Sequence, residues 1–108
     1  MPYVVTKARY PSYQANEVAK RGIEVIKQFP PDKTLGDRLL PLAVYTSNKG
    51  IKYMVVTEIK AGKLEEALTR AGKSQAMFLG IEGYESTTEV WSTASEAYST
   101  INMKSPIE

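Results

Sequence analysis

Charged side chains interrupt stretches of the chain that are otherwise apolar, and these charges are the residues best suited to chemistry. Lys7 and Arg9 fall in the first such stretch, and Glu58 and Glu89 fall in two later ones. If they share one face of a sheet, Arg9 or Lys7 can bind an anionic ligand while Glu58 or Glu89 acts as a base. The alternative is an ion-pair network, completed by Glu85, that fixes the register of a dimer. We favour the network, because charges at strand ends are often solvated.

Four aromatic residues form a second group, namely Tyr45, Tyr53, Tyr84 and Trp91. They could line a cleft for a planar substrate, with a tyrosine hydroxyl donating a hydrogen bond to it. The competing interpretation is that they pack in the core or an interface, because large aromatics supply much of the burial in a small domain. The candidate pocket-lining residues are therefore Lys7, Arg9, Tyr45, Tyr53, Glu58, Glu89 and Trp91, and the sequence assigns none of them a catalytic role.

Composition excludes several classes of site and partner. The 108 residues include no Cys and no His, so disulfides, thiolate zinc sites and histidine acid/base chemistry are absent. Asp32 and Asp37 lie in one charged loop, but nothing there fixes a metal geometry, and we expect neither a metal nor a cofactor. A net charge of +2 provides no concentrated basic field for nucleic acid. We find no signal peptide or membrane span, and we expect a cytoplasmic protein.

The elements that must position these residues follow from periodicity and turn signals. Alternation and β-branched residues predict strands, helical spacing of apolar residues predicts helices, and Thr93 with Glu96 has the spacing of a capping box. Pro41 favours a sheet edge or a bulge in its strand, and residues 72–74 are expected to bend or interrupt the second helix. The expected elements are strands at 3–10, 35–48, 51–60 and 84–91, and helices at 13–29, from 64 to 79, and at 94–103.

This order is β-α-β-β-α-β followed by a tail. It predicts an α+β domain over residues 1–92 and a helical tail over residues 93–108, frayed from residue 104 onward. Both crossovers place their helices on one face of a four-stranded antiparallel sheet, with strand one between strands three and four. We expect the other face to carry Val5, Tyr53, Val55, Ile59 and Trp91. Because soluble monomers rarely expose so large an apolar patch, the pattern predicts a homodimer with its sheets face to face.

Two stretches resemble the dimeric α/β-barrel superfamily, whose ferredoxin-like subunits pair through their sheets. They are residues 53–60 followed by Gly62–Ala67, and Gly83–Glu85 with Thr88–Trp91. The chain is most similar to the small uncharacterised members. The resemblance implies a homodimeric barrel, in a superfamily that includes cofactor-free monooxygenases, haem-degrading enzymes, isomerases, dehydratases and amino-acid-sensing domains. Several of its enzymes rely on His, and this chain has none.

We therefore expect a homodimer, with the option of a higher oligomer, that binds a small ligand or a protein partner in the cleft between sheet and helices without catalysis. The first alternative is a cofactor-free monooxygenase or isomerase acting on a small aromatic or acidic substrate. The second is a structural or assembly module. Neither nucleic acid nor a membrane is an expected partner.

Overall fold

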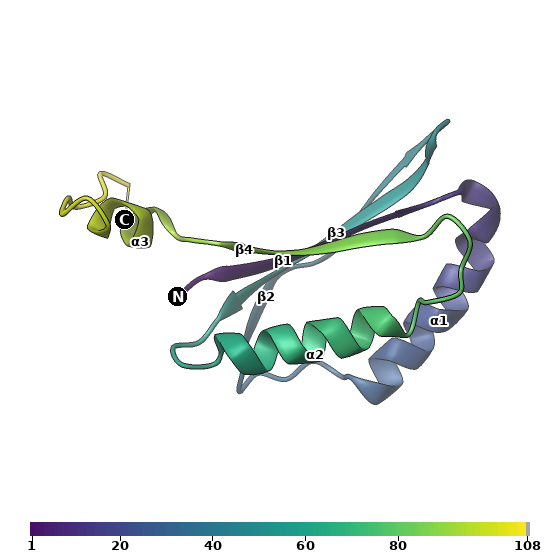
Figure 1. Ribbon diagram of the computed structural model, residues 1–108, viewed down its shortest axis with the longest axis horizontal. Coiled ribbons are helices and arrows are strands. Elements are labelled where there is room, and N and C mark those ends of the chain that lie inside the picture. Colours follow the sequence, from purple (N-terminus) through teal and green to yellow (C-terminus); the bar gives the residue numbers. More distant parts are fainter. Residues whose placement is uncertain (108) are drawn as a thin grey trace.

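The computed structural model describes residues 1–107 and contains one four-stranded sheet with three α-helices (Figure 1). The strand order is β2-β3-β1-β4, and every neighbouring pair is antiparallel. The α+β fold, the βαββαβ order and the central position of the first strand are confirmed. The elements are β1 (Tyr3–Tyr10), α1 (Ala15–Gln28), β2 (Gly36–Ser47), β3 (Gly50–Ile59), α2 (Leu64–Ala76), β4 (Glu85–Trp91) and α3 (Ala94–Ser99), with a 3-10 turn at Ser12–Gln14.

Four details differ from the sequence-based expectation. The first helix starts two residues late, because a 3-10 turn follows Pro11. The second helix runs without interruption through residues 72–74, since Gly72 lies on its exposed side and weakens the helix by only about 1 kcal/mol relative to Ala. It ends at Ala76 rather than Leu79, and Phe78 and Leu79 lie in the turn that follows it. The last helix ends at Ser99 rather than Met103, and Asn102 beyond it has a left-handed backbone with φ 59°.

The β2–β3 hairpin follows its expected turn and bulge signals. The turn residues are Asn48 and Lys49, and the Ser47 hydroxyl accepts a hydrogen bond from the Lys49 N–H at 3.2 Å. Gly50 has φ 127°, and a Cβ atom there would lie 2.7 Å from the Tyr10 carbonyl oxygen, so the position requires glycine. The strand register shifts on both sides of Leu40, next to Pro41, which cannot donate to the ladder.

Two apolar clusters fill the space between the sheet and helices α1 and α2, which lie on the same side of it (Figure 1). The first joins Val4, Ile59 and Ala67, and the second joins Val18, Phe78 and Ile81, with Tyr10 and Tyr84 packed against it. Because side chains alternate along a strand, Tyr3, Val5, Lys7 and Arg9 of β1 must point to the opposite side. We call that uncovered side the open face.

The structure corrects the prediction of which β3 residues lie on each face of the sheet. In the β1–β3 register, Val55 is opposite Thr6 and Tyr53 is opposite Ala8, and Ile59 belongs to the core, so all three lie on the helix-covered face. Val5 and Trp91 lie on the open face, as expected. The error arose because both faces of this strand carry apolar residues, and such a pattern cannot reveal which set faces the helices.

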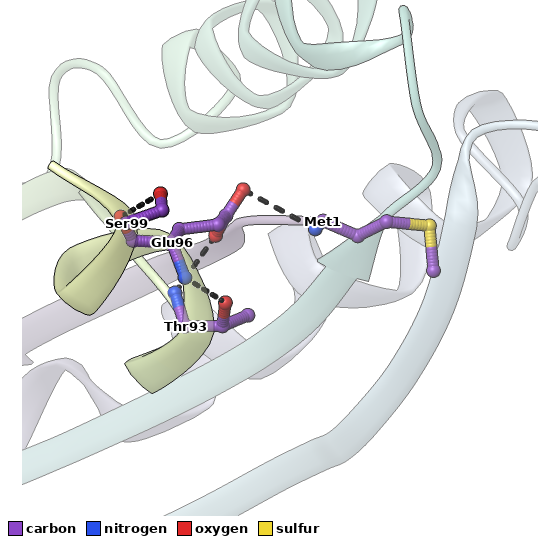
Figure 2. A network of polar contacts seen from close by, with 4 residues as sticks. All are labelled: Met1, Thr93, Glu96 and Ser99. Carbon is purple, nitrogen blue, oxygen red and sulfur yellow. Dashed lines mark hydrogen bonds and ion pairs between the residues drawn. The ribbon is translucent and has the colours of Figure 1, made fainter. Parts of the chain in front are cut away.

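The tail begins with the predicted capping box (Figure 2). The Glu96 N–H donates to the Thr93 hydroxyl at 3.1 Å, and the Thr93 N–H donates to the Glu96 carboxylate at 2.8 Å. The same carboxylate lies 3.2 Å from the Met1 amino group, which ties α3 to the start of β1. The Thr93 N–H, more than the amino group, holds the pKa of Glu96 below its usual value. The division between residues 92 and 93 stays a prediction, and Glu108 of the predicted tail lies outside the described residues.

Candidate ligand site on the open sheet face

The register of the four strands arranges the open face as four rows that cross the sheet. Each row takes one residue from β2, β3, β1 and β4 in that order. The first row lies nearest the β2–β3 turn, and the fourth lies at the opposite end of the sheet. The rows are Tyr45-Lys52-Arg9-Glu85, Ala43-Met54-Lys7-Thr87, Leu40-Val56-Val5-Glu89 and Asp37-Glu58-Tyr3-Trp91.

Two ion pairs link β1 to β4 on this face. Arg9 donates from Nε and Nη2 to one Glu85 carboxylate oxygen, at 3.0 and 2.8 Å. Lys7 Nζ lies 3.3 Å from the Glu89 carboxylate and 5.7 Å from the centre of the Trp91 ring. The pairing of Lys7 and Arg9 with the glutamates of the fourth strand is therefore confirmed.

Glu58 was expected beside Lys7 and Arg9, and that expectation is wrong. It lies in the fourth row, opposite Tyr3 and Asp37, whereas the β3 neighbours of Lys7 and Arg9 are Met54 and Lys52. Antiparallel pairing reverses the direction of β3 relative to β1. The charge near the end of β3 therefore meets the beginning of β1.

Glu89 is held as a carboxylate by its neighbours. The Trp91 indole N–H donates to it at 2.9 Å, and this hydrogen bond, followed by that of Lys7, holds the pKa of Glu89 below its usual value. A carboxylate with a lowered pKa is a weaker base. The arrangement therefore favours a positioning role for Glu89 over proton abstraction.

A hollow of about 570 Å³ lies over the first two rows. Four of the candidate pocket residues border it, namely Lys7, Arg9, Tyr45 and Tyr53, whereas Glu58, Glu89 and Trp91 do not. Sequence reasoning missed Lys52, Met54, Ala43 and Glu85 as its other principal walls. The signal that would have found Lys52 and Met54 is the alternation of β3, read in the phase opposite to the one predicted.

Tyr53 borders the hollow, but its hydroxyl belongs to a polar cluster on the helix-covered side. The Tyr53 and Tyr84 hydroxyls are 2.7 Å apart, and Tyr84 donates to the Gln75 side-chain oxygen at 2.8 Å. The Tyr84 ring also stacks on Phe78 at a centroid distance of 4.9 Å. Burial, more than the Tyr53 hydroxyl, raises the pKa of Tyr84. For these two tyrosines the packing interpretation applies, and they occupy part of the space where the ligand cleft was expected.

A second hollow, of about 580 Å³, lies beside α2 and the loop that follows α1. Arg70 lines this hollow. Its guanidinium donates a hydrogen bond to the Pro30 carbonyl and lies 5.5 Å from the centre of the Phe29 ring. Asp32 on its rim accepts hydrogen bonds from Thr34, which lower the pKa of this carboxyl. Within residues 1–107, no three acidic side chains gather in a way that could hold a metal ion. None of the helices in that range is long and apolar enough to cross a bilayer.

Comparison with known proteins identifies the fold but no relative. No protein-family model matches the chain, and no curated protein matches it. Among solved structures, the chain is similar to a dimeric ferredoxin-like protein from an uncultured marine organism, with 16% sequence identity and a TM-score of 0.54. The likeness covers 85% of this chain and 94% of the other. The chain therefore has a ferredoxin-like fold, as its resemblance to the dimeric α/β-barrel superfamily implied.

Proposed function

We propose that the protein is a homodimer paired through its open sheet faces, and that the hollow over the first two rows binds a small organic ligand without catalysis. The observation that carries this proposal is the sheet face that the chain's own helices leave uncovered.

The surface of a single chain is too large for a folded monomer of its size. The accessible area is 7393 Å² for 12.0 kDa, whereas monomers of this mass expose about 6,000 Å². The radius of gyration is 15.6 Å, against about 13 Å for a compact chain of this length. The excess of about 1,400 Å² exceeds the roughly 800 Å² that each partner buries in a standard interface. The excess surface is therefore large enough to form one standard interface with a second copy.

Exposed apolar side chains mark where that copy would bind. Trp91 is 53% exposed and Tyr45 is 64% exposed, and they lie at opposite corners of the open face. The structural neighbour is described as dimeric, which supports the same assembly here on the basis of the shared fold.

The hollow has the mixed character of a ligand site. Ala43 and Met54 supply apolar walls, Tyr45 supplies a phenol, and Lys7 and Arg9 supply N–H donors. A volume of about 570 Å³ lies within the ordinary range for small-molecule pockets. A ligand with an aromatic or aliphatic body and a hydrogen-bond-accepting end fits these walls, and a partner subunit would close the open side.

No specific observation supports either alternative, the cofactor-free enzyme or the assembly module. The two carboxylates proposed as bases, Glu58 and Glu89, do not border the hollow, and the pKa of Glu89 is lowered rather than raised. An assembly role would need a second interface, for which α3 is the nearest candidate. A cytoplasmic location stays a prediction from the sequence.

Two measurements test the proposal. Sedimentation equilibrium between 1 and 100 μM should give twice the chain mass, and a monomer throughout that range would refute the dimer. Thermal-shift screening with small aromatic and aliphatic carboxylic acids should then identify stabilising compounds. Ala43→Leu, which extends a larger side chain into the hollow, should weaken or remove their effect, whereas Ala19→Leu on the exposed side of α1 should not. Equal responses in both variants and the unmodified protein would contradict the site.

A further inference from the structure

The open face is divided into two halves of opposite charge. The first two rows contain Lys7, Arg9 and Lys52 with a single carboxylate, Glu85. The third and fourth rows contain Asp37, Glu58 and Glu89 and no cation. The half near the β2–β3 turn therefore has a net charge of +2, and the other half has a net charge of −3.

Three of these charges have no ion-pair partner within residues 1–107, namely Lys52, Asp37 and Glu58. In addition, Lys52 lies directly across from Arg9, and Asp37 lies directly across from Glu58. Like charges at directly opposite positions of neighbouring strands destabilise a sheet. Each half of the open face thus has an excess of one sign, which the other half would balance.

We propose that the two copies pair with their strands antiparallel across the interface, so that the first row of one copy lies over the fourth row of the other. This arrangement rests on the homodimer proposed above. Lys52 then faces the partner's Glu58, and the cationic half of each copy meets the acidic half of its partner. The dimer contains this contact twice, because a two-fold interface uses the same patch on both copies.

Geometry leaves a simple choice between two aligned arrangements. In the aligned class of face-to-face packing, two sheets lie about 10 Å apart with strand directions within about 30° of each other, whereas in the orthogonal class the strands cross at about 90° and whole rows do not superpose. A two-fold axis along the strands would place each row of one copy over the same row of the other copy, so that like charges meet. A two-fold axis across the strands places the first row on the fourth and the second on the third. Only the second arrangement brings opposite charges together.

The apolar side chains fit the same arrangement. With the axis across the strands, Met54 of the second row faces the partner's Val56, and Ala43 faces the partner's Leu40. Over β2 and β3, the centre of the interface is then apolar and both ends are charged, which is the usual distribution in a stable interface. The partner's acidic row also covers the hollow. A ligand there would meet cations of one copy and carboxylates of the other.

Charge reversal distinguishes the two arrangements. Lys52→Glu alone and Glu58→Lys alone should each raise the dimer dissociation constant by about tenfold or more at low salt, because each creates like charges across the interface. The chain carrying both changes should return to within about threefold of the unmodified protein. Lys20→Glu on the exposed side of α1 makes the same charge change as the first variant, away from the sheet, and should have little effect.

The readout is sedimentation equilibrium at 50 and 500 mM NaCl, with circular dichroism to verify folding. Salt should weaken the unmodified dimer and shrink the differences between variants, because exposed charges are screened. If the unmodified chain is dimeric but the doubly changed chain does not recover, this arrangement is wrong while the dimer stands. If the unmodified chain is monomeric at 100 μM, the homodimer itself is refuted.

Discussion

The two faces of the sheet are made by alternate residues of the same strands, yet they differ in what completes them. On the helix-covered face, Ile59 is 1% exposed, and the hydroxyls of Tyr53 and Tyr84 are bonded to each other and to Gln75. On the open face, Trp91 is 53% exposed and Lys52 has no ion-pair partner within residues 1–107. On the helix-covered face, packing and hydrogen bonds are completed within a single chain. On the open face, charged and apolar side chains remain exposed.

The largest effect should come from the covered face. Ile59→Ala removes a fully buried side chain that packs on Val4 and Ala67, and should lower the free energy of unfolding by about 2–5 kcal/mol. Urea denaturation followed by circular dichroism, at matched protein concentration, measures it. Ile101→Ala, at a position 62% exposed, should change the value by less than about 0.5 kcal/mol. Equal effects would mean that the covered face is not the core.

A charge at the centre of the open face should act on association instead. Val56→Asp places a carboxylate between Leu40 and Val5, where no cation lies in the same row, and burial of an unpaired charge costs several kcal/mol. We expect the dimer dissociation constant to rise about a hundredfold or more, with the circular dichroism of the monomer retained. Val90→Asp, at an exposed position on the opposite side of β4, is the control. Loss of folded structure without any change in mass would contradict the contrast between the faces.

Tyr84→Phe tests the polar cluster on the covered face. It removes one hydroxyl but leaves the hydrogen bond from Gln75 to Tyr53 at 3.2 Å, so we expect a loss of about 1 kcal/mol at neutral pH. Burial raises the pKa of Tyr84 in the folded state, so its neutral phenol favours folding below the unfolded value of about 10, and this contribution is lost as the pH rises above it.

Urea midpoints measured between pH 7 and pH 11 should therefore approach each other for Tyr84→Phe and the unmodified protein as the pH rises. Tyr13→Phe, at a position 72% exposed, should parallel the unmodified protein over the whole range. A constant difference between Tyr84→Phe and the unmodified protein would show that the Tyr84 phenol ionises equally easily in the folded and unfolded chains.

The smallest effect should be the acid sensitivity of Glu89 on the open face. Its lowered pKa means that its carboxylate stabilises the folded state above the unfolded value of about 4.3. That contribution is lost as the pH falls through the lower folded value. The melting temperature of Glu89→Gln should therefore lie slightly below that of the unmodified protein at pH 6, and the two should converge below about pH 4. A difference between the two melting temperatures that grows with acid would contradict the assignment.

Much of the candidate site could be predicted from the sequence, and the two omissions on β3 have one cause. Lys7, Arg9 and Tyr45 were predicted and border the hollow, because the alternation in β1 and the hairpin signal are clear. Lys52 and Met54 were missed, because β3 was assigned the wrong phase. The same error placed Tyr53 and Ile59 on the open face. The placement of Glu58 beside Arg9 was wrong for a different reason, because antiparallel pairing brings the end of β3 to the beginning of β1.

Local chemistry in the sequence determined the order of the elements, the turn at Asn48 and Lys49, the irregularity at Pro41 and the capping box at Thr93 and Glu96. These features depend on residues close together in the chain, so their signals are local. Only the tertiary structure decided which side of β3 meets the helices, which rows the charges form and where the hollow lies. Those outcomes depend on the pairing of strands distant in sequence, and a shift of one residue in that pairing exchanges the two faces.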